Sequence, residues 1–243
     1  LDRQARGCKE PALQLANTDL GGVGDFVHAR APIGGGDAAQ CSANDGIDIS
    51  TGATNNIVGG VIPGEGNLIA GQAGGGVRIQ KAATGTLIRG NTIWGNGTGV
   101  AVMAGSGHLI QQNSIYGNTN LGIDLVGGTE SNSVTANDAP GTWTATDRDP
   151  DGGANDLKNF PVLATASTDG TSTITITGSL NGTAGRTYRI EFFSNPSADA
   201  PSGHGEGRTY LGFVNVTADA SGAAAISATL SGVSVSVGSS ITA

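Results

Sequence analysis

The stretch NTIWGNGTGVAVMAGSGHLIQQNSIYGN, residues 91–118, carries nearly the same hexapeptide at its two ends. NTIWGN at 91–96 returns as NSIYGN at 113–118, and NLIAGQ at 67–72 is an earlier copy. Two further sets of short apolar runs accompany these hexapeptides. One set is GIDI at 46–49, GVRI at 76–79, GVAV at 99–102 and GIDL at 122–125, and the other is NIVGG at 56–60, TLIRGN at 86–91 and HLIQQN at 108–113.

Each repeat of about 23 residues therefore holds three short apolar runs separated by Gly, Asn or Thr turns. Helical repeats are excluded because no window has a 3.6-residue apolar period. Leucine-rich repeats need several regularly placed leucines, which are absent. The pattern predicts a right-handed parallel β-helix whose coils stack at a strand spacing of about 4.8 Å.

Stacked coils place equivalent residues above one another in columns. We expect one inward ladder of side-chain amides from Asn67, Asn91 and Asn113, and a second from Gln72, Asn96 and Asn118. Ile69, Ile93 and Ile115 are expected to fill the core between the ladders. The repetition is thus interpreted as structural.

The outward column of the first strands contains Asp48, Arg78, Ala101 and Asp124. We expect Asp48 and Arg78 to pair as neighbours. The two acidic residues are three coils apart, about 14 Å, whereas the carboxyl groups of a glycosidase lie about 5–9.5 Å apart. This column argues against catalysis, and His108 is interpreted as a surface or turn residue.

The segments before and within the repeat have separate interpretations. VIPGEG at 61–66 is predicted to be an inserted loop, and residues 1–45 a cap with a short helix around 11–16. Cys8 and Cys41 either form a disulfide, worth about 3–4 kcal/mol for a loop of about 33 residues, or remain two buried thiols. The disulfide favours an oxidising, extracellular setting.

Residues 46–137 are predicted to be the β-helix, 138–160 an acidic linker and 161–243 a small antiparallel Ig-like β-sandwich. Half-buried strands are indicated at 161–167, 171–180, 187–194, 209–217 and 222–230, with a last one at SITA, 240–243. The chain is accordingly expected to be all-β, a short β-helix followed by this sandwich.

Three runs of this region resemble the C-terminal half of bacterial secreted right-handed β-helix repeat proteins. They are NDAPG with DRDPDGGANDLKNFPVL, then TYRIEFFSNPSADAPSGHGEGRTYLG, then VTADASGAAAISATL. The resemblance covers roughly residues 46–243 and implies an NxIxGN-type β-helix, this linker and this sandwich. It also implies a last strand that continues beyond SSITA.

The strongest local motif for chemistry is DRDPDG at 147–152. Carboxylates at alternate positions followed by glycine can direct several oxygens at one hard cation. We predict a structural Ca²⁺ site, with a solvated acidic turn as the alternative. The predicted ligands are Asp147, Asp149, Asp151, Asn155 and Asp156. Lys158 stands where an EF-hand requires Glu.

Composition restricts the partners. A net charge of −8 with only 12 Lys and Arg argues against nucleic acid, and no apolar run approaches the roughly 20 residues of a membrane span. Gly accounts for 42 of 243 residues, whereas an average protein has about 7% Gly. This excess of glycine is consistent with a chain that contains many turns. An extracellular or cell-surface protein is expected.

Trp94 and Tyr116 occupy equivalent outward positions, with Arg89 and Gln111 as further candidates for carbohydrate or partner contact. A purely stabilising aromatic stack is the alternative for the two rings. We expect a non-catalytic structural or adhesive module, a subunit of a surface filament or other head-to-tail assembly whose partner is itself. The competing hypothesis is a β-helix protein that binds or degrades a surface polysaccharide.

Overall fold

The structure is a computed structural model. It describes residues 45–50, 52–128, 130–131, 134–199 and 206–243, with the backbone of 13–15 and 26–27. The chain divides into two compact units, Leu1–Asp124 and Leu125–Ala243. Among the described residues, no helix has the length and apolar character needed to cross a membrane.

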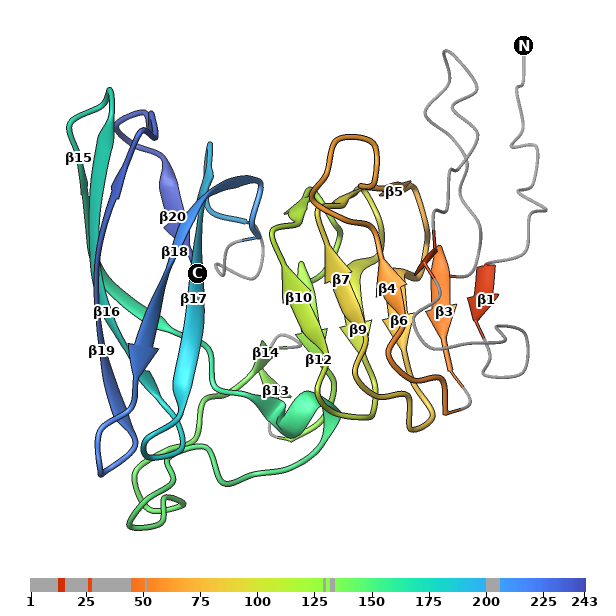
Figure 1. Ribbon diagram of the computed structural model, residues 1–243, viewed down its shortest axis with the longest axis horizontal. Coiled ribbons are helices and arrows are strands. Elements are labelled where there is room, and N and C mark those ends of the chain that lie inside the picture. The colour runs from red at the N-terminus through yellow and green to blue at the C-terminus, as the bar shows by residue number, and fades with distance from the viewer. Residues whose placement is uncertain are drawn as a thin grey trace. The chain divides into compact units, whose positions relative to one another are not determined.

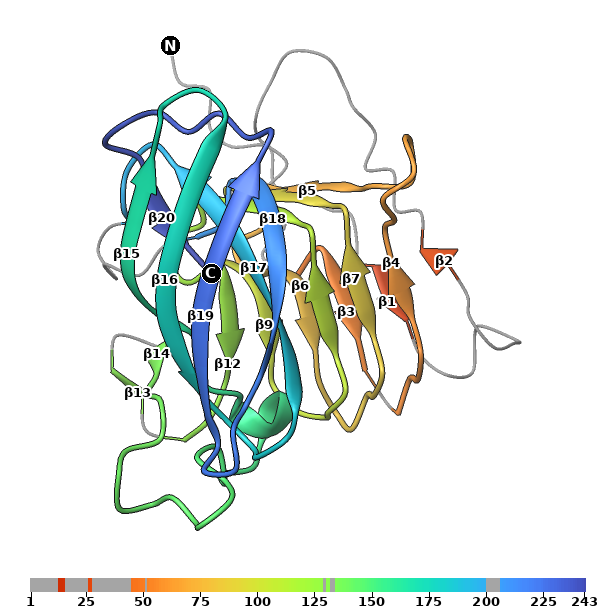
Figure 2. The same cartoon turned by 60° about the vertical axis from the view of Figure 1, so that its left-hand side comes forward.

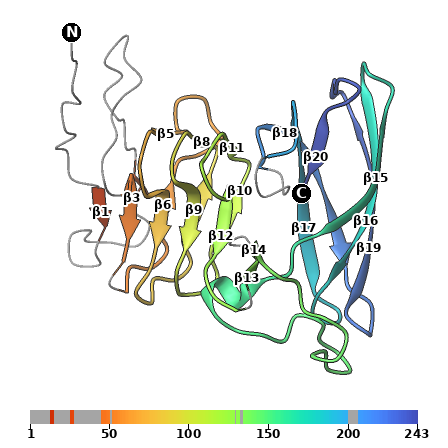
Figure 3. The ribbon, with the colours of Figure 1, turned by 180° about the vertical axis from the view of Figure 1, so that it is seen from behind.

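The first unit is built from three parallel sheets, which confirms the predicted β-helix architecture (Figure 1). The first sheet has the order β1-β3-β6-β9-β12, with β1 (Leu13–Leu15), β3 (Ile47–Ile49), β6 (Gly75–Ile79), β9 (Thr98–Val102) and β12 (Ile123–Leu125). The second has the order β10-β7-β4-β2, with β2 (Phe26–Val27), β4 (Ile57–Val58), β7 (Leu87–Arg89) and β10 (Leu109–Gln111). The third is β11-β8-β5, with β5 (Leu68–Ala70), β8 (Thr92–Trp94) and β11 (Ser114–Tyr116) (Figure 3).

The strand register follows the repeated motifs. Ile47 pairs with Val77 and Val77 with Val100, while Ile69 pairs with Ile93 and Ile93 with Ile115. Alternate residues of these short strands point inward, and branched aliphatic side chains fill the interior. The helix expected around residues 11–16 is wrong where the structure describes it. Leu13–Leu15 is instead strand β1, paired in parallel with β3.

Both amide ladders are confirmed. Asn91 Oδ1 accepts hydrogen bonds from the backbone N–H of Asn67 at 3.0 Å and from its Nδ2 at 2.9 Å. Asn91 in turn donates from its backbone and side chain to Asn113 Oδ1, both at 3.0 Å. Asn96 and Asn118 repeat the pattern at the next corner. There the backbone N–H of Gln72 donates to Asn96 Oδ1, while its side-chain Nε2 donates to the carbonyl of Ala70. These buried amides satisfy turn backbone that water cannot reach.

The second unit begins with irregular chain. It contains the strands β13 (Glu130–Ser131) and β14 (Val134–Thr135) and the 3₁₀ helix η1 (Ala154–Leu157). Two three-stranded antiparallel sheets follow, which confirms the small sandwich (Figure 2). One is β15-β16-β19, with β15 (Val162–Thr168), β16 (Thr173–Asn181) and β19 (Ala223–Ser231). The other is β18-β17-β20, with β17 (Thr187–Asn195), β18 (Thr209–Thr217) and β20 (Ser240–Thr242).

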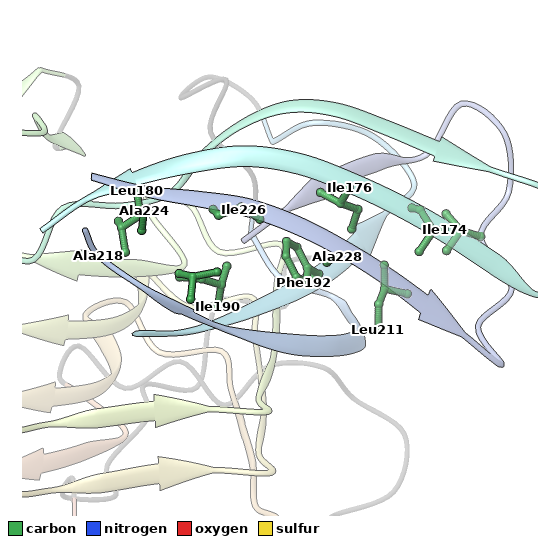
Figure 4. Packing of buried hydrophobic residues seen from close by; sticks show 12 residues of the cluster. Ile174, Ile176, Leu180, Ile190, Phe192, Leu211, Ala218, Ala224, Ile226 and Ala228 are labelled. Atoms are coloured by element: carbon green, nitrogen blue, oxygen red, sulfur yellow. The ribbon is translucent and has the colours of Figure 1, made fainter. Parts of the chain in front are cut away.

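The core of the sandwich lies between these sheets. Figure 4 shows Ile174 and Ile176 from one sheet and Ile190 and Phe192 from the other, all pointing into the shared interior. Phe192 and Ile176 are completely buried. The alternation of apolar and polar residues along TSTITITGSL and TYRIEFFS produces these two inward faces.

Candidate functional site

Three aspartates meet in the segment between β14 and β15. Asp138, Asp149 and Asp151 each place one carboxylate oxygen within 4.8 Å of the other two. We call this group the acidic triad. It is the one cluster of three or more His, Cys, Asp or Glu side chains with metal-ligand spacing in the part of the chain that the structure describes.

Asn159 holds the two halves of the triad together. Its Oδ1 accepts the backbone N–H of Asp138 at 2.8 Å, and its own backbone N–H donates to Asp149 Oδ1 at 2.8 Å. Its Nδ2 donates to the carbonyl of Arg148 at 2.7 Å. Asn159 is buried, so these bonds fix the approach of Asp138 and Asp149, which are eleven residues apart in the sequence.

Negative charge exceeds positive charge in the triad. Lys158 Nζ lies 2.7 Å from Asp149 Oδ2 and 3.8 Å from Asp156 Oδ2. Burial raises the pKa of the Asp149 carboxyl, while the Lys158 ammonium opposes that rise. Burial also raises the pKa of Asp151, and the neighbouring charges of Asp138 and Asp149 raise it further. One ammonium thus faces three carboxylates.

Two oxygens of the triad have no donor while both carboxyls are ionised. Asp138 Oδ2 and Asp151 Oδ1 are shielded from solvent and accept no hydrogen bond from the described residues, whereas a protonated Asp151 would donate to Asp138. A buried carboxylate oxygen without a donor is unfavourable unless a cation or water satisfies it. The arrangement has the chemistry of a site for a hard cation, which prefers oxygen ligands.

The structure brings together only some of the predicted ligands. Asp149 and Asp151 belong to the triad, whereas Asp147 Oδ1 accepts hydrogen bonds from the Asp149 N–H and from Thr183 Oγ1, both at 3.1 Å. Asn155 and Asp156 lie in η1 outside the triad. Sequence reasoning missed Asp138, which precedes DRDPDG by nine residues and has no spacing relation to it.

Charged side chains at the first sheet bind side chains of the neighbouring coil. Asp48 and Arg78 are neighbours in register, as expected. Their predicted pairing is wrong, because Arg78 Nη1 bonds to Asp45 Oδ2 at 3.0 Å. Asp48 instead accepts both of its bonds from Gln80 Nε2, at 3.0 and 2.9 Å. In both cases the acidic residue binds a side chain of the next coil, with Asp45 just before β3 and Asp48 within it.

His108 is a ladder residue and not a surface residue. It is 4% exposed, and its Nδ1 accepts the backbone N–H of Thr86 in the preceding coil at 3.2 Å. Burial lowers the pKa of His108, partly offset by hydrogen bonds to the backbone of Ala104 and Ala83. The signal in the sequence was the alignment of HLIQQN with TLIRGN, which places His108 and Thr86 in one column.

The predicted aromatic pair is present on the third sheet. Trp94 and Tyr116 pair in register, with ring centroids 6.2 Å apart and ring planes inclined by 9°. Trp94 is 38% exposed. Arg89 and Gln111 are register neighbours on the second sheet, and Arg89 Nε has no hydrogen-bond partner among the described residues. Cys8 and Cys41 lie outside the described residues.

Comparison with known families adds one finding. Residues 38–155 match the family model of NosD, described as a periplasmic copper-binding protein. The matched stretch contains the strands β3 to β12 of the β-helix and all three aspartates of the acidic triad. The comparison with curated proteins found no match.

The described residues do not fit a copper site. Copper favours imidazole, thiolate and thioether ligands, but the imidazole of His108 is buried and accepts a backbone hydrogen bond through Nδ1. The acidic triad offers only carboxylate oxygens, which suit calcium, magnesium or manganese. Similarity to a copper-binding family therefore does not carry copper chemistry over to these side chains.

Proposed function

We propose that this protein is a non-catalytic structural or adhesive module outside the cytoplasm that assembles head-to-tail with copies of itself. The non-catalytic part rests on the observation that polar side chains on and inside the β-helix bind groups of the neighbouring coil. Asp45 and Asp48 bind side chains of the neighbouring coil, and His108 completes a buried ladder. The name of the similar family, which is periplasmic, supports the location.

The non-catalytic role is tested by incubating the purified chain with acidic and neutral polysaccharides. We expect neither new reducing ends nor unsaturated sugars above the level given by heat-unfolded protein. Release of either product, abolished by Asp48→Asn but not by Thr92→Ala, would contradict the proposal. Thr92 lies on the outer face of another sheet, so its substitution controls for general damage.

Carbohydrate binding without cleavage is the second candidate, because of the Trp94–Tyr116 pair. Two nearly parallel rings on adjacent coils form an aromatic strip that can stack on sugar rings. Glycan-array binding and its loss in Trp94→Ala would support this role. Trp94→Phe, which keeps a ring, and Leu109→Ala, an exposed aliphatic truncation on another sheet, are the matched controls.

We further propose that the acidic triad binds a structural Ca²⁺ ion. The two unsatisfied oxygens and the excess of carboxylates over ammonium groups support it. Calcium is expected to raise the thermal midpoint and EDTA to lower it. Asp138→Asn should remove this response, whereas Asp156→Asn should keep it, since Asp156 lies outside the triad. An unchanged midpoint with calcium in the native chain would refute the site.

A further inference from the structure

The aromatic column on the third sheet has a ring in two of its three described coils. Ala70 pairs with Trp94 and Trp94 with Tyr116, so these residues form one outward column across β5, β8 and β11 (Figure 3). Trp94 and Tyr116 contribute rings, whereas Ala70 contributes only a methyl group. Strands of neighbouring coils are about 4.8 Å apart. The column is therefore one ring short at the level of Ala70.

The indole of Trp94 is covered on one side only. Tyr116 stacks against it with the ring planes inclined by 9°, and it is the one ring that contacts Trp94 in the described chain. Trp94 lies on the middle strand of its sheet, between two neighbouring strands, and is nevertheless 38% exposed. Ala70 explains this exposure, because a methyl group on the β5 side cannot cover an indole.

The surroundings of this position are apolar and uncharged. Leu68 lies two residues before Ala70 on the same outer face of β5 and is 45% exposed. None of the residues of β5, β8 and β11 is charged. The whole chain carries a net charge of −8, so its field disfavours an anionic ligand and leaves a neutral ligand unaffected.

We propose that the position beside Ala70 is a subsite for one ring of a neutral oligosaccharide, stacked on the side of Trp94 that Tyr116 leaves open. A pyranose ring has faces of C–H groups and an edge of hydroxyl groups, so a face packs on an indole while the edge stays in water. Leu68 extends the apolar contact. The inference rests on the carbohydrate-binding candidate above, to which it adds the position and the charge class of the sugar.

Isothermal titration calorimetry of the full chain with cellohexaose, mannohexaose, chitohexaose and hexagalacturonate tests the subsite. We expect at least one neutral hexasaccharide to bind, and hexagalacturonate to bind more weakly. Ala70→Tyr places a ring of the protein in the subsite and should weaken binding about tenfold or more, because that ring takes the place of the sugar. The matched control Leu109→Tyr adds an exposed ring on another sheet and should keep the native affinity.

The outcomes separate the subsite from the wider candidate. A native chain that binds a neutral hexasaccharide, together with an Ala70→Tyr variant of equal affinity, overturns the subsite and leaves carbohydrate binding elsewhere on the chain. Tighter binding of hexagalacturonate than of every neutral hexasaccharide overturns the proposed charge class. A native chain that binds none of the four at millimolar concentrations overturns both the subsite and the carbohydrate-binding candidate.

Tryptophan fluorescence tests the stacking without any change at Ala70. The chain has two tryptophans, and Trp143→Phe leaves Trp94 as the only one while keeping a ring beneath Arg148. Saturation with the hexasaccharide that binds should shift the Trp94 emission to shorter wavelengths and reduce its quenching by acrylamide. Emission and quenching that stay unchanged while calorimetry shows binding would overturn the proposal.

Discussion

Single buried side-chain amides connect neighbouring coils of the β-helix. Asn91 is 1% exposed, and its Nδ2 donates to the carbonyls of Val58 at 2.9 Å and Arg89 at 3.1 Å while its Oδ1 serves Asn67. Each corner of the chain thus depends on a side chain from the next coil. The ladder explains why an asparagine recurs at this turn of every full hexapeptide copy.

Asn91→Ala is expected to destabilise the protein by about 3–5 kcal/mol, because several buried donors and acceptors lose their partner at once. Thr92→Ala, the next residue on the outer face, should cost less than about 1 kcal/mol. Chemical denaturation of both variants measures the difference. Equal losses for the two would show that the ladder is not what stabilises this corner.

His108 makes the stability of the β-helix depend on pH. Its Nδ1 must be unprotonated to accept the Thr86 N–H, and burial lowers its pKa below the ordinary value. The unfolded chain therefore takes up the proton first as the pH falls. The stability contribution is complete above about pH 6.5 and is lost as the pH falls toward the lower folded pKa.

His108→Asn places the ladder amide of the other corners at this position and removes the titration. We expect the native chain to lose stability relative to this variant below about pH 6.5, by at most about 1.4 kcal/mol per pH unit for one proton. Urea unfolding at a series of pH values checks it. A gap between the two proteins that is constant with pH would contradict the assignment.

At the scale of elements, close backbone stacking limits the turns. Gly90 and Gly95 both have positive φ angles, 67° and 64°. A Cβ at Gly90 would overlap the carbonyl oxygen of Gly60, whereas a Cβ at Gly95 would meet no atom within 4 Å. The same backbone conformation therefore occurs with and without a steric constraint from the neighbouring coil.

Substituting Gly90 and Gly95 separates the cost of a left-handed backbone from the cost of close packing between coils. Gly95→Ala should cost about 1–2 kcal/mol, the price of a left-handed alanine. Gly90→Ala should cost about 1–3 kcal/mol more, because the carbonyl of Gly60 must move. Thermal unfolding of the two variants is the measurement, and similar losses would argue against tight stacking at this corner.

The elements and ladders of the β-helix could be predicted because a repeat places equivalent residues in register without any tertiary knowledge. The ladder of Asn67, Asn91 and Asn113 could be predicted from their spacing alone. The acidic triad could be predicted in part, since DRDPDG is local and supplied Asp149 and Asp151. Asp138 could not, because the buried Asn159, a tertiary contact, brings it to the site.

At the scale of the whole molecule, the two units are organised differently. The sheets of the β-helix stack coil on coil. The sandwich instead packs two three-stranded antiparallel sheets around a shared core. The proposed head-to-tail assembly adds contacts between whole chains.

The most direct test of that account is the mass of the native chain in solution, measured by light scattering across a series of protein concentrations. Head-to-tail assembly predicts a mass above that of one chain, rising with concentration because heterologous contacts that do not close can continue to add subunits. A mass equal to one chain at every concentration would contradict the proposed role as an assembling structural module.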